Sequence, residues 1–128
     1  MKNESAVTQA FRKHVPKRIM WRRIEDSSGS LGTWDTWLGH DERGGWIEFK
    51  HTKTKGAKPK QRAGQAAFGH DLMKSGVKGF YIIGSADGWV RVCSRRMIDV
   101  AWPNSLIIKQ KNMDEALVHK VLDWMKLM

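Results

Sequence analysis

Residues 33–61, TWDTWLGHDERGGWIEFKHTKTKGAKPKQ, are the stretch of sequence that decides the fold. Strand-forming side chains are frequent at 33–38 and again at 46–50, and each run has the length of a short β-strand. Three glycines and several charged residues fall between the two runs, at 39–45, and this composition is typical of a turn. The segment therefore predicts two neighbouring strands joined by a turn, followed by a basic loop.

Helices and further strands are expected on either side of this segment. In chain order we expect a helix at 3–14, strands at 18–24, 33–38 and 46–50, a helix at 59–75, strands at 79–84 and 89–93, and a last helix from about residue 112. The middle helix has Pro59 just inside its start and Gly76 just past its end, which is the usual placement of these residues. This order predicts an α/β fold in which a mixed central β-sheet is flanked by helices, formed by one domain over residues 1–128.

The composition of the chain favours a polyanionic partner. Its 128 residues include 23 Lys+Arg and 13 Asp+Glu, which gives a net charge of +10, and 41% of the residues are hydrophobic. That hydrophobic fraction excludes a disordered basic tail, and the length excludes an α/β barrel. In a small folded protein such a basic surplus points to nucleic acid, with a basic surface kept for solubility as the alternative.

Cysteine usage and hydropathy bear on the compartment. Cys93 is the single cysteine, so there is no disulfide framework, and a reducing compartment is expected. The first residues are charged and lack the apolar run of a signal peptide, and no stretch approaches the roughly 18 apolar residues that span a membrane. We therefore expect a cytoplasmic location and no membrane partner.

The candidate catalytic residues lie on the two strands of this segment. In the second strand, side chains alternate between faces, so Glu48 and Lys50 share one face while Ile47 and Phe49 point to the other. If Ile47 and Phe49 face the core, Glu48 and Lys50 are held side by side on the opposite face. A hairpin also places Asp35, which comes 13 residues before Glu48, within a few ångströms of it.

Two carboxylates at that distance favour a magnesium site. They repel each other unless a positive charge neutralises them, and Mg²⁺ prefers carboxylate oxygens. The backbone carbonyl of Phe49 is a further candidate ligand, and Lys50 would lie beside the metal, where it could polarise water or stabilise charge on a phosphate. The alternative is that Glu48 and Lys50 form a solvated pair on an exposed strand face.

The pattern of Asp35, a linker and then Glu48-x-Lys50 resembles the core of the PD-(D/E)XK nucleases. Trp34 stands where that superfamily often has proline. The similarity is closest to the small VRR-NUC type, which includes phage nucleases and Holliday-junction resolvases, and it covers roughly residues 4 to 85. The resemblance implies a restriction-endonuclease-like core and hydrolysis of DNA with Mg²⁺, for which Mn²⁺ can substitute.

Two more site residues follow from the resemblance. Glu4 lies at the start of the first helix, where the family carries an additional acid; its alternative role is to stabilise the helix dipole. Gln61, next to Pro59-Lys60, resembles the glutamine of the helix after the Glu-x-Lys strand, and we prefer it to Gln65, one turn further on. An ordinary surface role is the alternative for Gln61.

A basic segment follows the proposed site, with no acidic residue in it. The candidate DNA-binding residues are Lys53, Lys55, Lys58, Lys60 and Arg62. Beside two carboxylates, such a cluster suggests phosphate contacts that position a duplex. The alternative is a solvated loop.

The function expected from these features is Mg²⁺-dependent endonuclease activity on DNA. The chain has little room for a sequence-reading domain, so structure-selective cutting of branched DNA, as in Holliday-junction resolution, is favoured. Two cuts at a junction imply a homodimer, with Trp102 or the apolar stripe of the last helix at the interface. A DNA-binding module without chemistry and a sequence-specific restriction-type nuclease are the alternatives.

Overall fold

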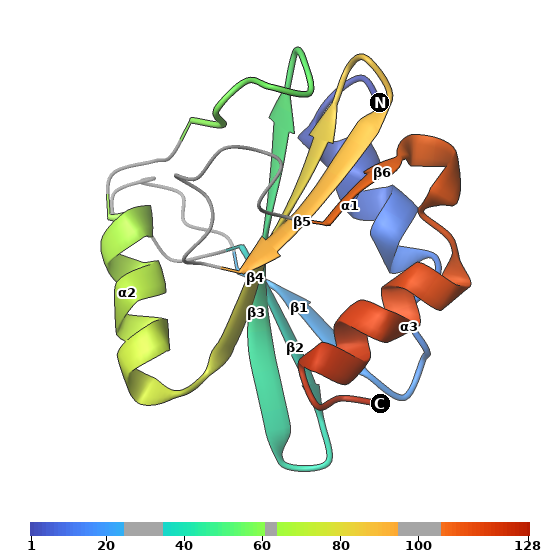
Figure 1. Cartoon of the computed structure of the whole chain (residues 1–128). Coiled ribbons are helices and arrows are strands. Elements are labelled where there is room, and N and C mark those ends of the chain that lie inside the picture. Colours follow the sequence, from blue (N-terminus) through green and yellow to red (C-terminus); the bar gives the residue numbers. More distant parts are fainter. Residues whose placement is uncertain (25–34, 61–63, 95–105) are drawn as a thin grey trace.

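Six strands form one continuous sheet in the computed structural model of the chain (Figure 1). The structure describes residues 1–24, 35–60, 64–94 and 106–128. The strands, which are neighbours in numerical order, are β1 (Met20–Arg23), β2 (Thr36–His40), β3 (Arg43–Thr52), β4 (Lys78–Ser85), β5 (Trp89–Ser94) and β6 (Leu106–Lys109). Strands β3 and β4 run parallel and the other neighbours run antiparallel. The predicted α/β class with a mixed sheet and flanking helices is therefore confirmed.

Helices cover both faces of the sheet (Figure 1). The helices are α1 (Glu4–Arg12), α2 (Gln65–Ser75) and α3 (Glu115–Trp124), and a short 3₁₀ helix, η2 (Gln110–Asn112), precedes α3. Helix α2 belongs to the crossover that joins the parallel strands β3 and β4, and it lies on one face. Helices α1 and α3 lie on the other face, as expected when each face of a sheet buries its apolar side chains.

Each face of the sheet has its own apolar core. Because successive side chains of a strand point to opposite faces, neighbouring residues of a strand contribute to different cores. The larger core, under α1 and α3, contains Val7, Phe11, Leu38, Ile47, Phe49, Ile82, Val90, Val92, Val118, Val121, Leu122 and Met125. The smaller core, under α2, contains Leu72, Tyr81, Ile83 and Cys93. Ile47 and Phe49 therefore face the larger core, as expected, and Glu48 and Lys50 face the side of α2.

A two-residue turn sets the register between β2 and β3. Asp41 and Glu42 both adopt left-handed backbone conformations, with φ of 52° and 63°, as a type I′ hairpin turn requires. The strands then pair with Thr36 opposite Ile47. Asp35, which directly precedes β2, consequently lies beside Glu48.

Close packing sets the position of α1 on the sheet. Asn3 caps the helix by accepting a hydrogen bond from the Ala6 amide over 2.9 Å. Phe11 packs edge-on against Phe49, with ring centroids 5.7 Å apart. Val7 is so close to Gly84 of β4 that a β-carbon there would collide with its side chain. These contacts determine where Glu4, at the start of the helix, is placed.

Two expectations about the elements differ from the structure. Helix α2 begins at Gln65, not at Pro59, and Gly64 directly before it has a φ of 83°, which a right-handed helix cannot include. Strand β6 was not expected, because its four residues are too few for periodicity to identify. No helix in the described ranges is long and apolar enough to span a membrane.

The apolar stripe of the last helix was one of two candidates for a dimer interface, and part of it lies in the core of its own chain. Val118, Val121, Leu122 and Met125 are all buried against the sheet of their own chain. Trp124, which is 37% exposed, stacks on Phe80. Met128, at the end of the stripe, is 43% exposed, so the stripe is buried only in part and its role at an interface stays a prediction. Trp102, the other residue considered for an interface, lies outside the described residues.

Candidate active site

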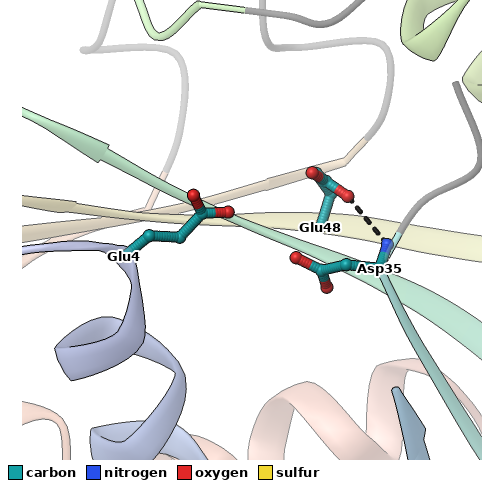
Figure 2. A group of neighbouring side chains, drawn as sticks. All are labelled: Glu4, Asp35 and Glu48. Carbon is teal, nitrogen blue, oxygen red and sulfur yellow. Dashed lines mark hydrogen bonds between the residues drawn. The ribbon is translucent and has the colours of Figure 1, made fainter. Parts of the chain in front are cut away.

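Three acidic side chains from separate elements converge at one end of the sheet (Figure 2). Glu4 is the first residue of α1, Asp35 directly precedes β2, and Glu48 lies within β3. One carboxylate oxygen of each lies within 4.8 Å of the others. The structure thus brings together Glu4, Asp35 and Glu48, which the sequence places up to 44 positions apart (48 − 4).

The hairpin register produces direct contact between two of these residues. The backbone amide of Asp35 donates a hydrogen bond to Oε2 of Glu48 over 2.9 Å. The hydroxyl of Thr36 donates to Oδ1 of Asp35 over 2.6 Å, and the backbone amide of Phe49 also donates to the Asp35 carboxylate. The backbone of both strands therefore orients the two carboxylates, whereas the Phe49 carbonyl as a ligand stays a prediction.

Burial makes this cluster costly when it is fully ionised. Glu48 is only 1% exposed, and burial together with the neighbouring Asp35 carboxylate raises its pKa to about 7. Burial also raises the pKa of Asp35, against the opposing effect of the Thr36 hydrogen bond. A cation placed among the three carboxylates would relieve this repulsion, so the donor set suits a hard divalent metal ion.

A glutamine links the acid and the lysine of the Glu-x-Lys pair. Gln65 donates through Nε2 to Oε1 of Glu48 over 2.8 Å and accepts through Oε1 from Nζ of Lys50 over 2.7 Å. The direct separation between Lys50 Nζ and Glu48 Oε1 is 3.5 Å. Gln65 is fully buried and Lys50 is 7% exposed, so these two side chains are held in place under α2.

Gln65, the alternative to Gln61 in the sequence, is thus in contact with both residues of the Glu-x-Lys pair. Gln61 and Arg62 lie outside the described residues. A signal for Gln65 was available in the pattern Gln65, Phe68 and Leu72, which repeats at three and four residues and puts all three on one helix face. That face packs on the sheet, so a polar residue within it needs a buried polar partner.

The cluster opens into a cleft of about 1050 Å³ whose walls carry basic side chains. The three carboxylates, Glu4, Asp35 and Glu48, are among its lining residues. The basic residues in its lining are Lys2, Arg23, Lys50, Lys53, Lys58 and Lys60. Three of the predicted DNA-binding residues are thus in the cleft wall. Arg23 belongs to a second basic cluster of the sequence that could extend the DNA contact, whereas Lys2 was not predicted. Lys2 lies just before α1 and Arg23 is the last residue of β1, so only the folded chain shows that both line the cleft together with the basic loop.

Lys55, also predicted to bind DNA, has other partners. Its ammonium lies 4.0 Å from the centre of the Trp89 ring, and its backbone amide donates to Oδ2 of Asp87 over 3.1 Å. Hydrogen bonds from Ser85 and from the Lys55 amide hold the pKa of Asp87 below its ordinary value. Lys55 thus fastens the basic loop to the β4–β5 turn and is not part of the cleft lining.

No known protein family, curated protein or solved structure matches this chain. The chemistry of the site therefore has to be argued from its own residues.

Proposed function

We propose that this protein is a Mg²⁺-dependent endodeoxyribonuclease built on the restriction-endonuclease-like core that its Asp…Glu-x-Lys pattern implies. The observation that carries the proposal is the convergence of Glu4, Asp35 and Glu48 beside Lys50, in a cleft whose walls are basic. Carboxylates suit a metal ion, and basic walls suit a phosphate backbone. A cleft that can hold both a metal cation and a phosphate anion fits hydrolysis of a nucleic-acid phosphodiester.

The three carboxylates and the Phe49 carbonyl are the proposed metal ligands. A bound Mg²⁺, or Mn²⁺ in its place, would lower the pKa of the attacking water and neutralise charge on the phosphate. The high pKa of Glu48 supports this assignment, because a buried carboxylate pair that lacks a cation costs the fold free energy.

The remaining residues are given roles by their positions. Lys50 would stabilise the negative charge that grows on the phosphate oxygens during attack. Gln65 would hold the Lys50 ammonium and the Glu48 carboxylate in fixed relative positions. Lys53, Lys58 and Lys60 would bind the DNA backbone. The products would carry a 5′ phosphate, as in the family that the sequence resembles.

We further propose that branched DNA, such as a four-way junction, is the preferred substrate and that the protein acts as a homodimer in the cytoplasm. The resemblance supports structure-selective cutting, since the family it points to includes Holliday-junction resolvases. Resolution of a junction requires two cuts, which two subunits would supply.

The test is cleavage of supercoiled plasmid and synthetic four-way junctions with Mg²⁺, with Ca²⁺ or with EDTA. We expect cutting with Mg²⁺, binding without cutting with Ca²⁺, and no cutting with EDTA. Asp35→Asn, Glu48→Gln and Lys50→Met should each lower the rate at least about 100-fold, the scale of losing one charge-stabilising group.

Asp41→Asn is the matched control, because it removes one carboxylate from the hairpin turn and asparagine tolerates the left-handed conformation there. Full nicking activity in all three site variants would refute the assignment. Binding without cutting in any metal would indicate a DNA-binding module, and discrete plasmid fragments would indicate a restriction-type enzyme.

A further inference from the structure

A second hollow lies beside the cleft, and it is basic as well. Its volume is about 590 Å³, and Lys13, Lys109, Gln110 and Lys111 are among its lining residues. No acidic side chain is in this lining among the residues that the structure describes. Three ammonium groups around one hollow would repel each other, and an anion placed there would remove that repulsion.

The acidic residues nearest in sequence are already engaged elsewhere. Asp87, next to the lining residue Gly88, interacts with Ser85 and with the Lys55 amide. Asp114 caps α3 by accepting from the Leu117 amide over 2.9 Å. Neither carboxylate is described in contact with the lysines of the second hollow. The positive charge of these lysines therefore stays available to a ligand.

Met1 contacts one lining residue of each hollow through its backbone. The backbone nitrogen of Met1 donates to Oε1 of Gln110, in the second hollow, over 2.9 Å. The carbonyl oxygen of Met1 lies 3.0 Å from Nε2 of His51, which lines the cleft. Because the backbone of one residue spans about 4 Å from N to O, Gln110 Oε1 and His51 Nε2 are at most about 10 Å apart.

Helix α1 runs alongside both hollows. Asn3 lines the cleft and Ala10 lines the second hollow. Seven residues make nearly two helical turns, so these two residues lie on one side of the helix, separated by about 10 Å. By both measures, lining residues of the two basic hollows lie about 10 Å apart, beside the N-terminal residue and α1.

We propose that the second hollow is a phosphate-binding site for the same DNA duplex that occupies the cleft. One strand of B-DNA carries a phosphate for every 3.4 Å of helix axis, so a spacing of about 10 Å corresponds to about three phosphates along the strand. Lys13, Lys109 and Lys111 contact the backbone there, and they hold the duplex in register over the carboxylates. This inference rests on the proposed function for the occupant of the cleft.

The experiment measures how binding to a linear duplex depends on salt, in Ca²⁺ so that DNA stays intact. The triple variant Lys13→Gln, Lys109→Gln, Lys111→Gln should bind more weakly. The slope of log K against log salt should fall by up to about 2.7, since each lost contact removes about 0.9. The matched control is Lys74→Gln, Lys78→Gln, Lys126→Gln, which removes the same charge from residues that line neither hollow.

The outcomes separate this inference from the proposed function. Equal slopes for the two triple variants would overturn it, even if the wild type cuts DNA. If the triple variant of the second hollow binds four-way junctions more weakly but binds linear duplex normally, the inference is also overturned. The hollow would then contact a second arm of the junction and not the duplex in the cleft. If the wild type binds duplex but does not cut it with Mg²⁺, the proposed nuclease activity is refuted. The comparison of salt slopes then still tests whether the second hollow binds phosphate.

Discussion

The ammonium group of Lys50 donates its 2.7 Å hydrogen bond to Gln65 and lies further, 3.5 Å, from the carboxylate of Glu48. The glutamine therefore separates the charges of the Glu-x-Lys pair and is bonded to both. Since both polar atoms of its amide are engaged, Gln65 determines the orientation of Lys50 toward the cleft.

Loss of Gln65 should damage the site and the fold together. Gln65→Leu leaves a buried carboxylate and a buried ammonium each lacking one partner, at a cost of about 1–3 kcal/mol in the free energy of unfolding. We expect the cleavage rate to fall while binding to DNA in Ca²⁺ stays within about twofold. A double-mutant cycle with Lys50→Met measures the coupling, which for contacting residues is about 0.5–3 kcal/mol. Gln61→Leu is the comparison, and a larger rate loss there than in Gln65→Leu would contradict our assignment.

The metal-free protein should lose stability as the pH rises. The pKa of Glu48 is about 7 in the folded chain, against 4.5 ordinarily, so the folded state holds this proton more tightly than the unfolded state. The contribution is fully present below about pH 4.5, declines between pH 4.5 and 7, and is absent above pH 7. The decline amounts to about 3 kcal/mol, at 1.36 kcal/mol for each pH unit.

Urea unfolding in EDTA at pH 5, 6, 7 and 8 measures this decline. The matched variant Glu48→Gln cannot ionise at that position, so its unfolding free energy should change less with pH than that of the wild type. Parallel curves for the two proteins would show that Glu48 ionises normally.

Gly84→Ala should displace the helix that carries Glu4. The added β-carbon would collide with the Val7 side chain and come within 2.7 Å of the Met1 sulfur. Overpacking of this kind costs about 1–3 kcal/mol, and the shift of α1 should lower the cleavage rate as well. Thermal unfolding and plasmid nicking measure the two effects.

Two variants control the Gly84 experiment. Gly56→Ala adds the same methyl group where no atom lies within 4 Å, so its melting temperature should match the wild type. Val7→Ala combined with Gly84→Ala makes room for the new methyl group, and this pair should recover part of the activity. A Gly84→Ala protein as active as the wild type would mean that Glu4 contributes nothing to catalysis.

The lysines of the basic loop should differ in their effect on DNA binding. Lys58 lines the cleft, whereas the Lys55 ammonium lies over the Trp89 ring. Lys58→Gln should reduce the salt slope of duplex binding by about 0.9, and Lys55→Gln should leave it nearly unchanged. Both variants remove one charge from the same loop, so each is the control for the other. Equal slopes would show that the contact with Trp89 does not persist in the complex.

Much of the fold was predictable because its signals are local. Alternation at residues 46–50 correctly assigned Ile47 and Phe49 to a core, and it put Glu48 and Lys50 together on the other face. A turn between β2 and β3 was predicted from composition at 39–45, but it is shorter than predicted, because both strands extend to its two residues Asp41 and Glu42. Strand β6 was missed, because four residues show no usable periodicity.

The features that were missed depend on contacts between distant parts of the chain. Gln65 meets Glu48 because it is the first residue of α2, directly after Gly64, and a start of this helix at Pro59 was equally plausible from the sequence. The stripe of α3 had a clear period, but the period alone does not distinguish a core from an interface. From the sequence, Lys55 was as good a candidate for DNA binding as the other lysines of the loop. Only the fold shows that its ammonium lies over the ring of Trp89.

The turn at Asp41 and Glu42 also determines which changes this chain can tolerate. Asn or Gly can replace either residue, since both adopt left-handed conformations readily. A single inserted or deleted residue has a different effect, because a shift of one position in the pairing turns every side chain of one strand to the opposite face. Asp35 would then face the apolar core and lose its place beside Glu48. Variation at this tip is therefore expected in the identity of the residues and not in their number.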